Sequence, residues 1–332
     1  MNMRPIRLLF AAAIVLLAAC DKEDAPVLTP ETDITAGFDP DFARLLQDGG
    51  IIADATCITY AEVAGITELD VRGTFDDWKE GKGLTSLKGI EYFTSLAGLD
   101  CRINQLTALD VSKNTALTEL DCDNNQLTAL DLSRNTALKV LYCGRNQLTD
   151  LDLSRNTALK VLYCAYNHLT ALDLSQNTAL STLFCPHNQL TDLDVSRNTA
   201  LKNLSCHENQ LTAIDLSRNT ALTSFSCYTN RLTAIDVSQN TALTTLSCFQ
   251  NQFTALDFSR NTALEMLFCY ENQLTALDLS KNTAMTLLYC ETNPGNHGIF
   301  EVTLWPGSEL TARKESWEYD GQPVAVKYLG CE

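Results

Sequence analysis

The residues of this sequence best suited to chemistry are ten cysteines that recur every 21 residues. They are Cys101, Cys122, Cys143, Cys164, Cys185, Cys206, Cys227, Cys248, Cys269 and Cys290. Zinc sites use cysteine or histidine pairs at short spacing, such as Cys-x-x-Cys, and the sequence has no such pair. A fixed period gives neighbouring thiols parallel Cβ directions, which do not suit a disulfide. We therefore predict ten reduced, buried cysteines that act as small apolar residues.

Aspartates recur with the same period, and such an acidic column could suggest calcium. The column is Asp110, Asp131, Asp152, Asp173, Asp194, Asp215, Asp236, Asp257 and Asp278. Three residues later, seven of nine positions are basic: Lys113, Arg134, Arg155, Arg197, Arg218, Arg260 and Lys281. Calcium-binding solenoids carry glycine- and aspartate-rich turns, which are missing here. We interpret the two columns as a solvated face whose charges compensate one another.

Groups that could form a catalytic site are sparse. His168, His187 and His207 fall in successive repeats, which would allow a metal, but they occupy different repeat positions. Surface polar residues are the simpler interpretation. Gly-x-Ser-x-Gly, His-Glu-x-x-His and phosphate-loop motifs are all missing from the sequence. We expect neither an enzyme nor a bound metal or cofactor.

The cysteines belong to a 21-residue repeat that runs from residue 96 to residue 293. Each repeat contains two nested copies of Leu-x-x-Leu-x-Leu-x-x-Asn, with cysteine at the third apolar place of the first copy. Alternate residues of an extended segment point the same way, so Leu120 and Cys122 should face a shared core. The asparagines, such as Asn125 and Asn135, should turn the chain and bond to the neighbouring coil.

This pattern resembles the leucine-rich-repeat family, in the nested, internalin-like form of bacterial surface proteins. The resemblance implies a right-handed solenoid that binds a ligand, most simply a protein. Neither half of the repeat has the length or apolar pattern of a helix, so we expect a mainly β fold with two strand-like sides and little helix on the convex side.

Non-repeating segments flank the repeats. Residues 36–95 read as an N-terminal cap, with one helix from Asp39-Pro40 to Gly49-Gly50 and another starting over Thr59–Ala64. Residues 294–332 read as a β cap with strands at Phe300–Leu304 and Val324–Tyr328, which would cover an open sheet edge. Cys57 and Cys331 lie in opposite caps, too far apart to pair. We expect a monomer.

The N-terminus contains a basic region with Arg4 and Arg7, then an apolar run over Leu8–Ala19. The run of 12 residues is too short to span a bilayer and fits a signal peptide. Its end, Leu-Ala-Ala-Cys, resembles the lipobox of bacterial lipoproteins. The resemblance implies a signal peptide over residues 1–19 and lipidation of Cys20.

Residues 20–35 contain two prolines and little apolar material, which indicates a lipidated tether. Lys22-Glu23-Asp24 resembles a tag that sends lipoproteins to the outer surface of some Gram-negative bacteria. A competing rule interprets Asp21 as a signal for inner-membrane retention. We prefer the longer pattern and expect a lipid anchor in the outer membrane, with the repeats outside the cell. A net charge of −17 makes nucleic acid an unsuitable partner.

The outward positions on either side of each cysteine vary, whereas the opposite side of the repeat is uniform. Many of the variable residues are aromatic, and exposed aromatic residues are typical of interaction surfaces. We predict a ligand-binding face made of Tyr142, Tyr163, Phe184, His207, Tyr228, Phe249, Phe268, Tyr270 and Tyr289. The sequence therefore favours a cell-surface scaffold for protein interaction or adhesion. Glycan binding by ring stacking, and a passive stalk whose aromatic residues drifted after duplication, remain the alternatives.

Overall fold

The computed structural model describes residues 27–308, 310 and 316–329. These form two compact units, an N-terminal unit that ends at Thr157 and a C-terminal unit that starts at Ala158. The signal peptide, Cys20, Lys22-Glu23-Asp24 and Cys331 lie outside the described residues. None of the helices in the described part is long and apolar enough to cross a membrane.

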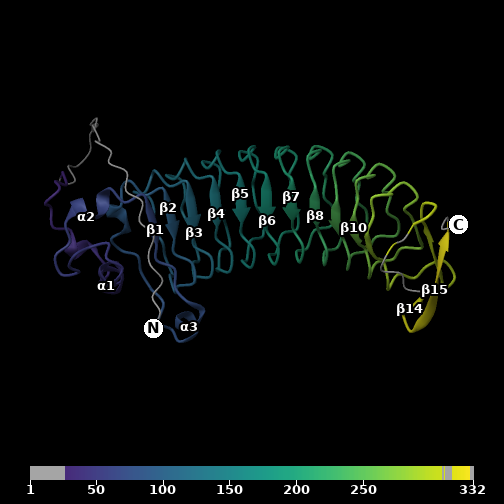
Figure 1. The fold of residues 1–332 in the computed structure, drawn as a ribbon, viewed down its shortest axis with the longest axis horizontal. Helices are drawn as coiled ribbons and strands as arrows, with labels where there is room; N and C mark the ends of the chain where they lie inside the picture. Colours follow the sequence, from purple (N-terminus) through teal and green to yellow (C-terminus); the bar gives the residue numbers. More distant parts are fainter. Residues whose placement is uncertain (1–26, 309, 311–315, 330–332) are drawn as a thin grey trace. The chain divides into compact units, whose positions relative to one another are not determined.

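The N-terminal unit opens with short helices (Figure 1): η1 (Thr35–Gly37), α1 (Pro40–Asp48), α2 (Tyr60–Ala64), α3 (Phe75–Lys79) and η2 (Ile90–Tyr92). The Asp39 carboxylate caps α1 by accepting from the backbone N–H groups of Asp41 and Phe42. Glu62 closes the first turn of α2 by accepting from the backbone N–H and hydroxyl of Thr59. Both predicted helices are confirmed.

Short parallel strands then repeat along each unit. The N-terminal unit contains β1 (Glu68–Asp70), β2 (Gly98–Asp100), β3 (Glu119–Asp121) and β4 (Val140–Tyr142). The C-terminal unit contains β5 (Val161–Tyr163), β6 (Thr182–Phe184), β7 (Asn203–Ser205), β8 (Ser224–Ser226), β9 (Thr245–Ser247), β10 (Met266–Phe268) and β12 (Leu287–Tyr289). Neighbouring strands are aligned so that equivalent residues of successive repeats pair, for example Leu99 with Leu120. Leu120 and Cys122 are fully buried, as predicted.

The sheet of the N-terminal unit begins one coil earlier than the repeats do. Strand β1 pairs in parallel with β2, so the cap contributes a strand rather than only helices. Its residues, Glu68-Leu69-Asp70, are the same three types as those of β3. This short motif, which lacks the cysteine that follows it in the repeats, was the only sequence signal for the extra strand.

Both asparagine columns bond to the neighbouring coil, as predicted. Asn125 donates to the carbonyls of Cys101 and Cys122 at 3.1 Å each and accepts from the Leu106 N–H at 3.0 Å. Asn135 donates to the carbonyls of Val111 and Asn114 at 3.0 and 2.9 Å. These bonds satisfy buried backbone groups at the corners, where no strand can pair them.

The prediction of a second strand-like side is wrong for most of the repeats. Among the described residues of the second half-repeats, only β11 (Ala276–Asp278) is a strand. Elsewhere Asp131 accepts from the Ser133 N–H, and the Asn135 N–H donates back to Leu132. These local bonds close tight turns. The coil of β11 makes the same bonds through Asp278 and Asn282, so what distinguishes β11 is its pairing with β13 of the cap.

The C-terminal cap continues from β11. Strand β13 (Ile299–Thr303) pairs with β11 in parallel, and β15 (Gln322–Leu329) pairs with β13 in the same way. Strand β14 (Ser316–Tyr319) returns antiparallel to β15. The predicted β cap is confirmed, with the first strand displaced by one residue.

Candidate functional site

Six rings of the C-terminal unit follow one another across successive coils, and we call them the aromatic row. They are Tyr163, Phe184, His207, Tyr228, Phe249 and Tyr270. The ring centroids of consecutive members lie 5.2, 5.9, 4.0, 4.2 and 4.3 Å apart. The first two rings end β5 and β6, and the other four follow the cysteine after β7 to β10. The last four rings therefore stack at separations shorter than the coil spacing of about 4.8 Å.

The row changes position between Phe184 and His207. Phe184 meets His207 at 77°, edge to face, whereas the later rings are stacked. In the three coils from His207 onward, the residue before the cysteine is serine: Ser205, Ser226 and Ser247. The fourth coil has rings on both sides of its cysteine, Phe268 and Tyr270. The two predicted groups of aromatic residues therefore form one continuous row.

Three other residues of the predicted face are not among these six rings. Phe268 and Tyr289 stack on each other at 5.4 Å, and Tyr289 is 36% exposed. Tyr142 ends β4 in the N-terminal unit and is half-buried. His207 is the exception to outward exposure, because only 8% of it is accessible beneath its neighbours.

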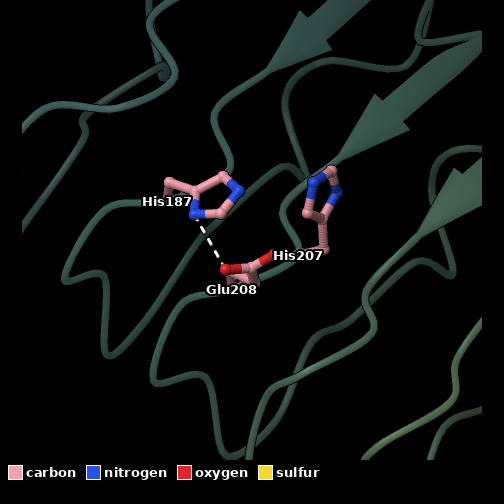
Figure 2. A group of neighbouring side chains, drawn as sticks. All are labelled: His187, His207 and Glu208. Atoms are coloured by element: carbon pink, nitrogen blue, oxygen red, sulfur yellow. Dashed lines mark ion pairs between the residues drawn. The ribbon is translucent and has the colours of Figure 1, made fainter. Parts of the chain in front are cut away.

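His207 of the row also forms a cluster with His187 and Glu208 (Figure 2). The Nδ1 atom of His187 lies 2.8 Å from a carboxylate oxygen of Glu208, and the two imidazole centroids are 5.8 Å apart. Burial, followed by the influence of His187, lowers the pKa of His207 to about 4. The ring is therefore neutral at physiological pH, with a lone pair available on one nitrogen.

The sequence did not predict this cluster. His187 and Glu208 occupy the position two residues after the cysteine, where the backbone has positive φ, 51° and 52°. Tyr166 occupies the same position, is 41% exposed and stacks on His187 at 3.9 Å. The available signal was this third variable column, which is adjacent to the predicted face. The interpretation of the histidines as surface residues holds for His168, which is exposed, and is wrong for His207.

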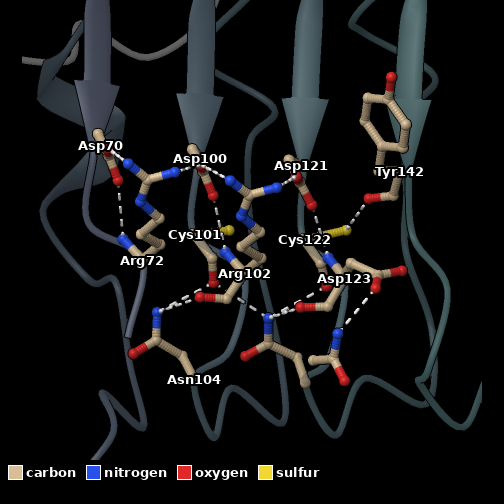
Figure 3. Close-up of polar contacts among 12 residues, drawn as sticks. Asp70, Arg72, Asp100, Cys101, Arg102, Asn104, Asp121, Cys122, Asp123 and Tyr142 are labelled. Carbon is tan, nitrogen blue, oxygen red and sulfur yellow. Dashed lines mark hydrogen bonds and ion pairs between the residues drawn. The ribbon is translucent and has the colours of Figure 1, made fainter. Parts of the chain in front are cut away.

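In the first two repeats of the N-terminal unit, the equivalent positions carry charge, and Tyr142 in the third carries a ring (Figure 3). Arg102 contacts Asp100 at 3.3 Å and Asp121 at 3.1 Å, and Arg72 contacts Asp70 at 3.1 Å and Asp100 at 3.6 Å. Burial, then the nearby Asp121 carboxylate, raises the pKa of Asp100 to about 6. Asp100 and Asp121 take the strand position that Tyr163 and Phe184 take in the C-terminal unit.

The ten cysteines of the repeat are free and buried, which confirms their predicted role as core residues. Burial raises the pKa of Cys164 to about 12, so its thiol stays protonated and unreactive. The Cys122 thiol donates to the carbonyl of Tyr142 at 3.4 Å. Cys57 is free and exposed.

Comparison with known proteins assigns the chain to a family. A family model described as leucine-rich repeats in two copies matches residues 115–156 and 136–177. The functional domain of InlJ from Listeria monocytogenes, whose structure includes a cysteine ladder, is 30% identical, with a TM-score of 0.53. The match covers 75% of this chain and 71% of that one. The chain belongs to the leucine-rich-repeat proteins.

Two further structures share the fold of this leucine-rich-repeat protein. The leucine-rich-repeat protein LIC12759 from Leptospira interrogans is 24% identical, with a TM-score of 0.63, over 71% of this chain and 69% of that one. The internalin InlF from Listeria monocytogenes is 23% identical, with a TM-score of 0.59, over 80% of this chain and 92% of that one. No curated protein sequence matches significantly.

The aspartate column of this leucine-rich-repeat protein is stabilised differently from the prediction. Asp131 accepts from the backbone N–H of Ser133 at 2.9 Å, and bonds to Ser133 are the main cause of its lowered pKa. Arg134 lowers that pKa by a smaller amount. Charge compensation by the basic column is therefore correct only in part, because each carboxylate is held mainly by the turn it belongs to.

Proposed function

We propose that this leucine-rich-repeat protein is a cell-surface scaffold that binds a protein ligand through the aromatic row. The carrying observation is that six rings lie in one unbroken line, with mutual contacts that hold them in place. Rings restrained in this way lose little conformational entropy when a ligand binds. Tyrosine and phenylalanine are also frequent anchors of protein interfaces.

The stacking geometry favours a protein over a glycan. Phe249 lies between Tyr228 and Tyr270 at 4.2 and 4.3 Å, with an interplanar angle of 10° on each side. Both faces of its ring are therefore covered by other rings. A sugar ring stacks on an open aromatic face, whereas the row offers mainly ring edges and tyrosine hydroxyls. Edges and hydroxyls suit the side chains and backbone groups of a protein.

The test compares two triple variants of the full-length chain against purified candidate surface proteins and a glycan array. The row variant changes Tyr228, Phe249 and Tyr270 to Ala, which Ala165 shows that the coil accepts at this position. The control changes Arg197, Arg218 and Arg260 to Gln, the residue found at the same repeat position in Gln176 and Gln239. We expect the row variant to lose more than about 2 kcal/mol of binding free energy and the control to lose little.

If the control variant loses binding free energy and the row variant does not, the binding surface lies on the second half of the repeats. Unchanged binding by both variants would exclude the row as the main interface. Ligands found only on the glycan array, with affinity lost in the row variant, would favour the carbohydrate alternative.

We also propose that the chain is anchored by lipid at Cys20. The support is the short apolar run that ends in Leu-Ala-Ala-Cys. A diacylglycerol thioether with an amide-linked acyl chain provides more than one lipid chain, which suffices for stable attachment. Cys20→Ala should abolish palmitate labelling, and normal labelling of that variant would contradict the proposal.

The proposed location is the outer surface of the outer membrane. The support is Lys22-Glu23-Asp24 immediately after the anchor. Protease added to intact cells should then remove the repeats while a periplasmic control protein survives. Equal protection of both proteins would mean that the repeats face the periplasm.

A further inference from the structure

Two imidazoles and one carboxylate converge beside the aromatic row, and this arrangement has the composition of a metal site. One possible ligand atom from each of His187, His207 and Glu208 lies within 4.8 Å of the other two (Figure 2). Tetrahedral zinc holds such atoms about 3.3 Å apart, as its bond lengths of about 2.0–2.2 Å require. The side chains of His187 and Glu208 are 27% and 37% exposed, so rotation of these two can close the gap.

We propose that His187, His207 and Glu208 bind one Zn²⁺ ion. Imidazole nitrogen and carboxylate oxygen are common zinc ligands, and three protein ligands leave a fourth position for water or another group. His187 and Glu208 contact each other directly at 2.8 Å. By itself this ion pair makes no use of the His207 lone pair.

The surroundings of His207 prepare it for this role. Its Nδ1 atom lies 2.8 Å from the Ser205 hydroxyl and 3.4 Å from that of Ser226. If Nδ1–H donates to Ser205, the lone pair is on Nε2, the pattern by which outer-shell groups orient metal-binding histidines. Tyr228 stacks on the imidazole at 4.0 Å and holds its plane. Tyr166 stacks on the partly exposed ring of His187 at 3.9 Å.

The repeat provides substitutions that keep the fold while removing each ligand. Phe249 occupies the position of His207 in a later coil, and Gln250 occupies that of His187 and Glu208. Other coils therefore already carry the residue types that the substitutions His207→Phe, His187→Gln and Glu208→Gln introduce. His168→Gln is the matched control, because His168 is exposed and outside the cluster.

The experiment is calorimetric titration of ZnCl₂ into the full-length chain, purified without a histidine tag and with exposed thiols blocked. We expect one Zn²⁺ per chain with a dissociation constant of about 1 µM or tighter. Each ligand substitution should weaken binding more than about 100-fold, since loss of an outer-shell group alone costs about 10- to 100-fold. Ser205→Ala should weaken it about tenfold, and His168→Gln should leave it unchanged.

Several results would overturn the proposal. These are failure of the parent chain to bind one zinc ion at that affinity, retention of affinity in all three ligand variants, and loss of affinity in His168→Gln. Co²⁺ in place of zinc gives an independent reading, because thiolate ligation produces an intense near-ultraviolet band. That band would assign the metal to cysteine and exclude this site. The titration uses zinc alone, so its outcome is independent of the proposed protein ligand.

Discussion

The two asparagine columns make different numbers of bonds, and this difference predicts unequal losses of stability. Asn251 donates to the carbonyls of Cys227 and Cys248 at 3.0 and 3.3 Å and accepts from the buried Leu232 N–H at 3.0 Å. Asn261, in the same coil, donates to two carbonyls at 2.9 Å each. Within the described residues, its buried Oδ1 atom accepts no hydrogen bond.

The expected difference follows from the backbone groups that each alanine substitution would leave unsatisfied. Neither substitution leaves a carbonyl without a donor. Cys227 and Cys248 still accept from Asn230 and Asn272, and Val237 and Asn240 still accept from the N–H groups of Asn240 and Leu243. Asn251→Ala, however, orphans the Leu232 N–H, which costs about 1–3 kcal/mol when the group is buried. Asn261→Ala removes a buried oxygen that had no partner, which reduces its cost. Asn251→Ala should therefore be more destabilising by at least about 1 kcal/mol.

Urea unfolding of the two variants and the parent chain measures this difference. Because repeat proteins unfold in segments, hydrogen–deuterium exchange of the peptide that carries Leu232 is the sharper assay. Exchange there should accelerate in Asn251→Ala beyond the change in Asn261→Ala. Equal destabilisation by both substitutions, together with equal exchange at Leu232, would refute this reasoning.

Three further predictions rest on single features of the coils. In the native protein the ten repeat cysteines should resist alkylation while the exposed Cys57 reacts. Mass spectrometry of alkylated protein before and after unfolding measures this. Disulfide-linked peptides among the ten would contradict the prediction. Thr229 is a β-branched residue with φ of 52°, and Asn124 shows that asparagine fits the same position. Thr229→Asn should therefore raise the free energy of unfolding by about 1 kcal/mol. A lower free energy of unfolding in urea titration would speak against backbone strain at this position. The pKa of His207 is lowered from 6.5 to about 4, so the unfolded chain takes up the proton first and stability should fall by about 2–3 kcal/mol as pH decreases through that window. His207→Phe should flatten this part of the stability curve, and an unchanged slope would assign it to other groups.

Much of the fold could be predicted because residues at equivalent positions of a strictly periodic repeat have the same structural surroundings. Leu120 and Cys122 had to face the core, since alternate residues of an extended segment point the same way. Asn125 and Asn135 had to bond to neighbouring coils, because a buried corner leaves backbone groups unpaired. The starts of α1 and α2 followed from Asp39-Pro40 and Thr59, which carry local capping chemistry.

The errors arose where the outcome depends on residues of other coils. The second half-repeat has the apolar alternation of a strand, but among the described half-repeats only β11 is a strand, and it pairs with β13 of the cap. His207 occupies an outward column, but Phe184 and Tyr228 cover it from adjacent coils. Neither the missing strand nor the burial of His207 can be predicted from one repeat, because both depend on residues of other coils.

The sequence alone determined the solenoid, its register and its core, since equal repeat lengths bring equivalent residues together whatever their neighbours are. Only the tertiary structure decided which unlike positions meet. The left-handed backbone two residues after each cysteine turns His187 and Glu208 toward His207, a residue from the adjacent column. A period relates each residue to its own equivalents, whereas contacts between columns depend on backbone direction and side-chain rotamers that exist only once the coils have stacked.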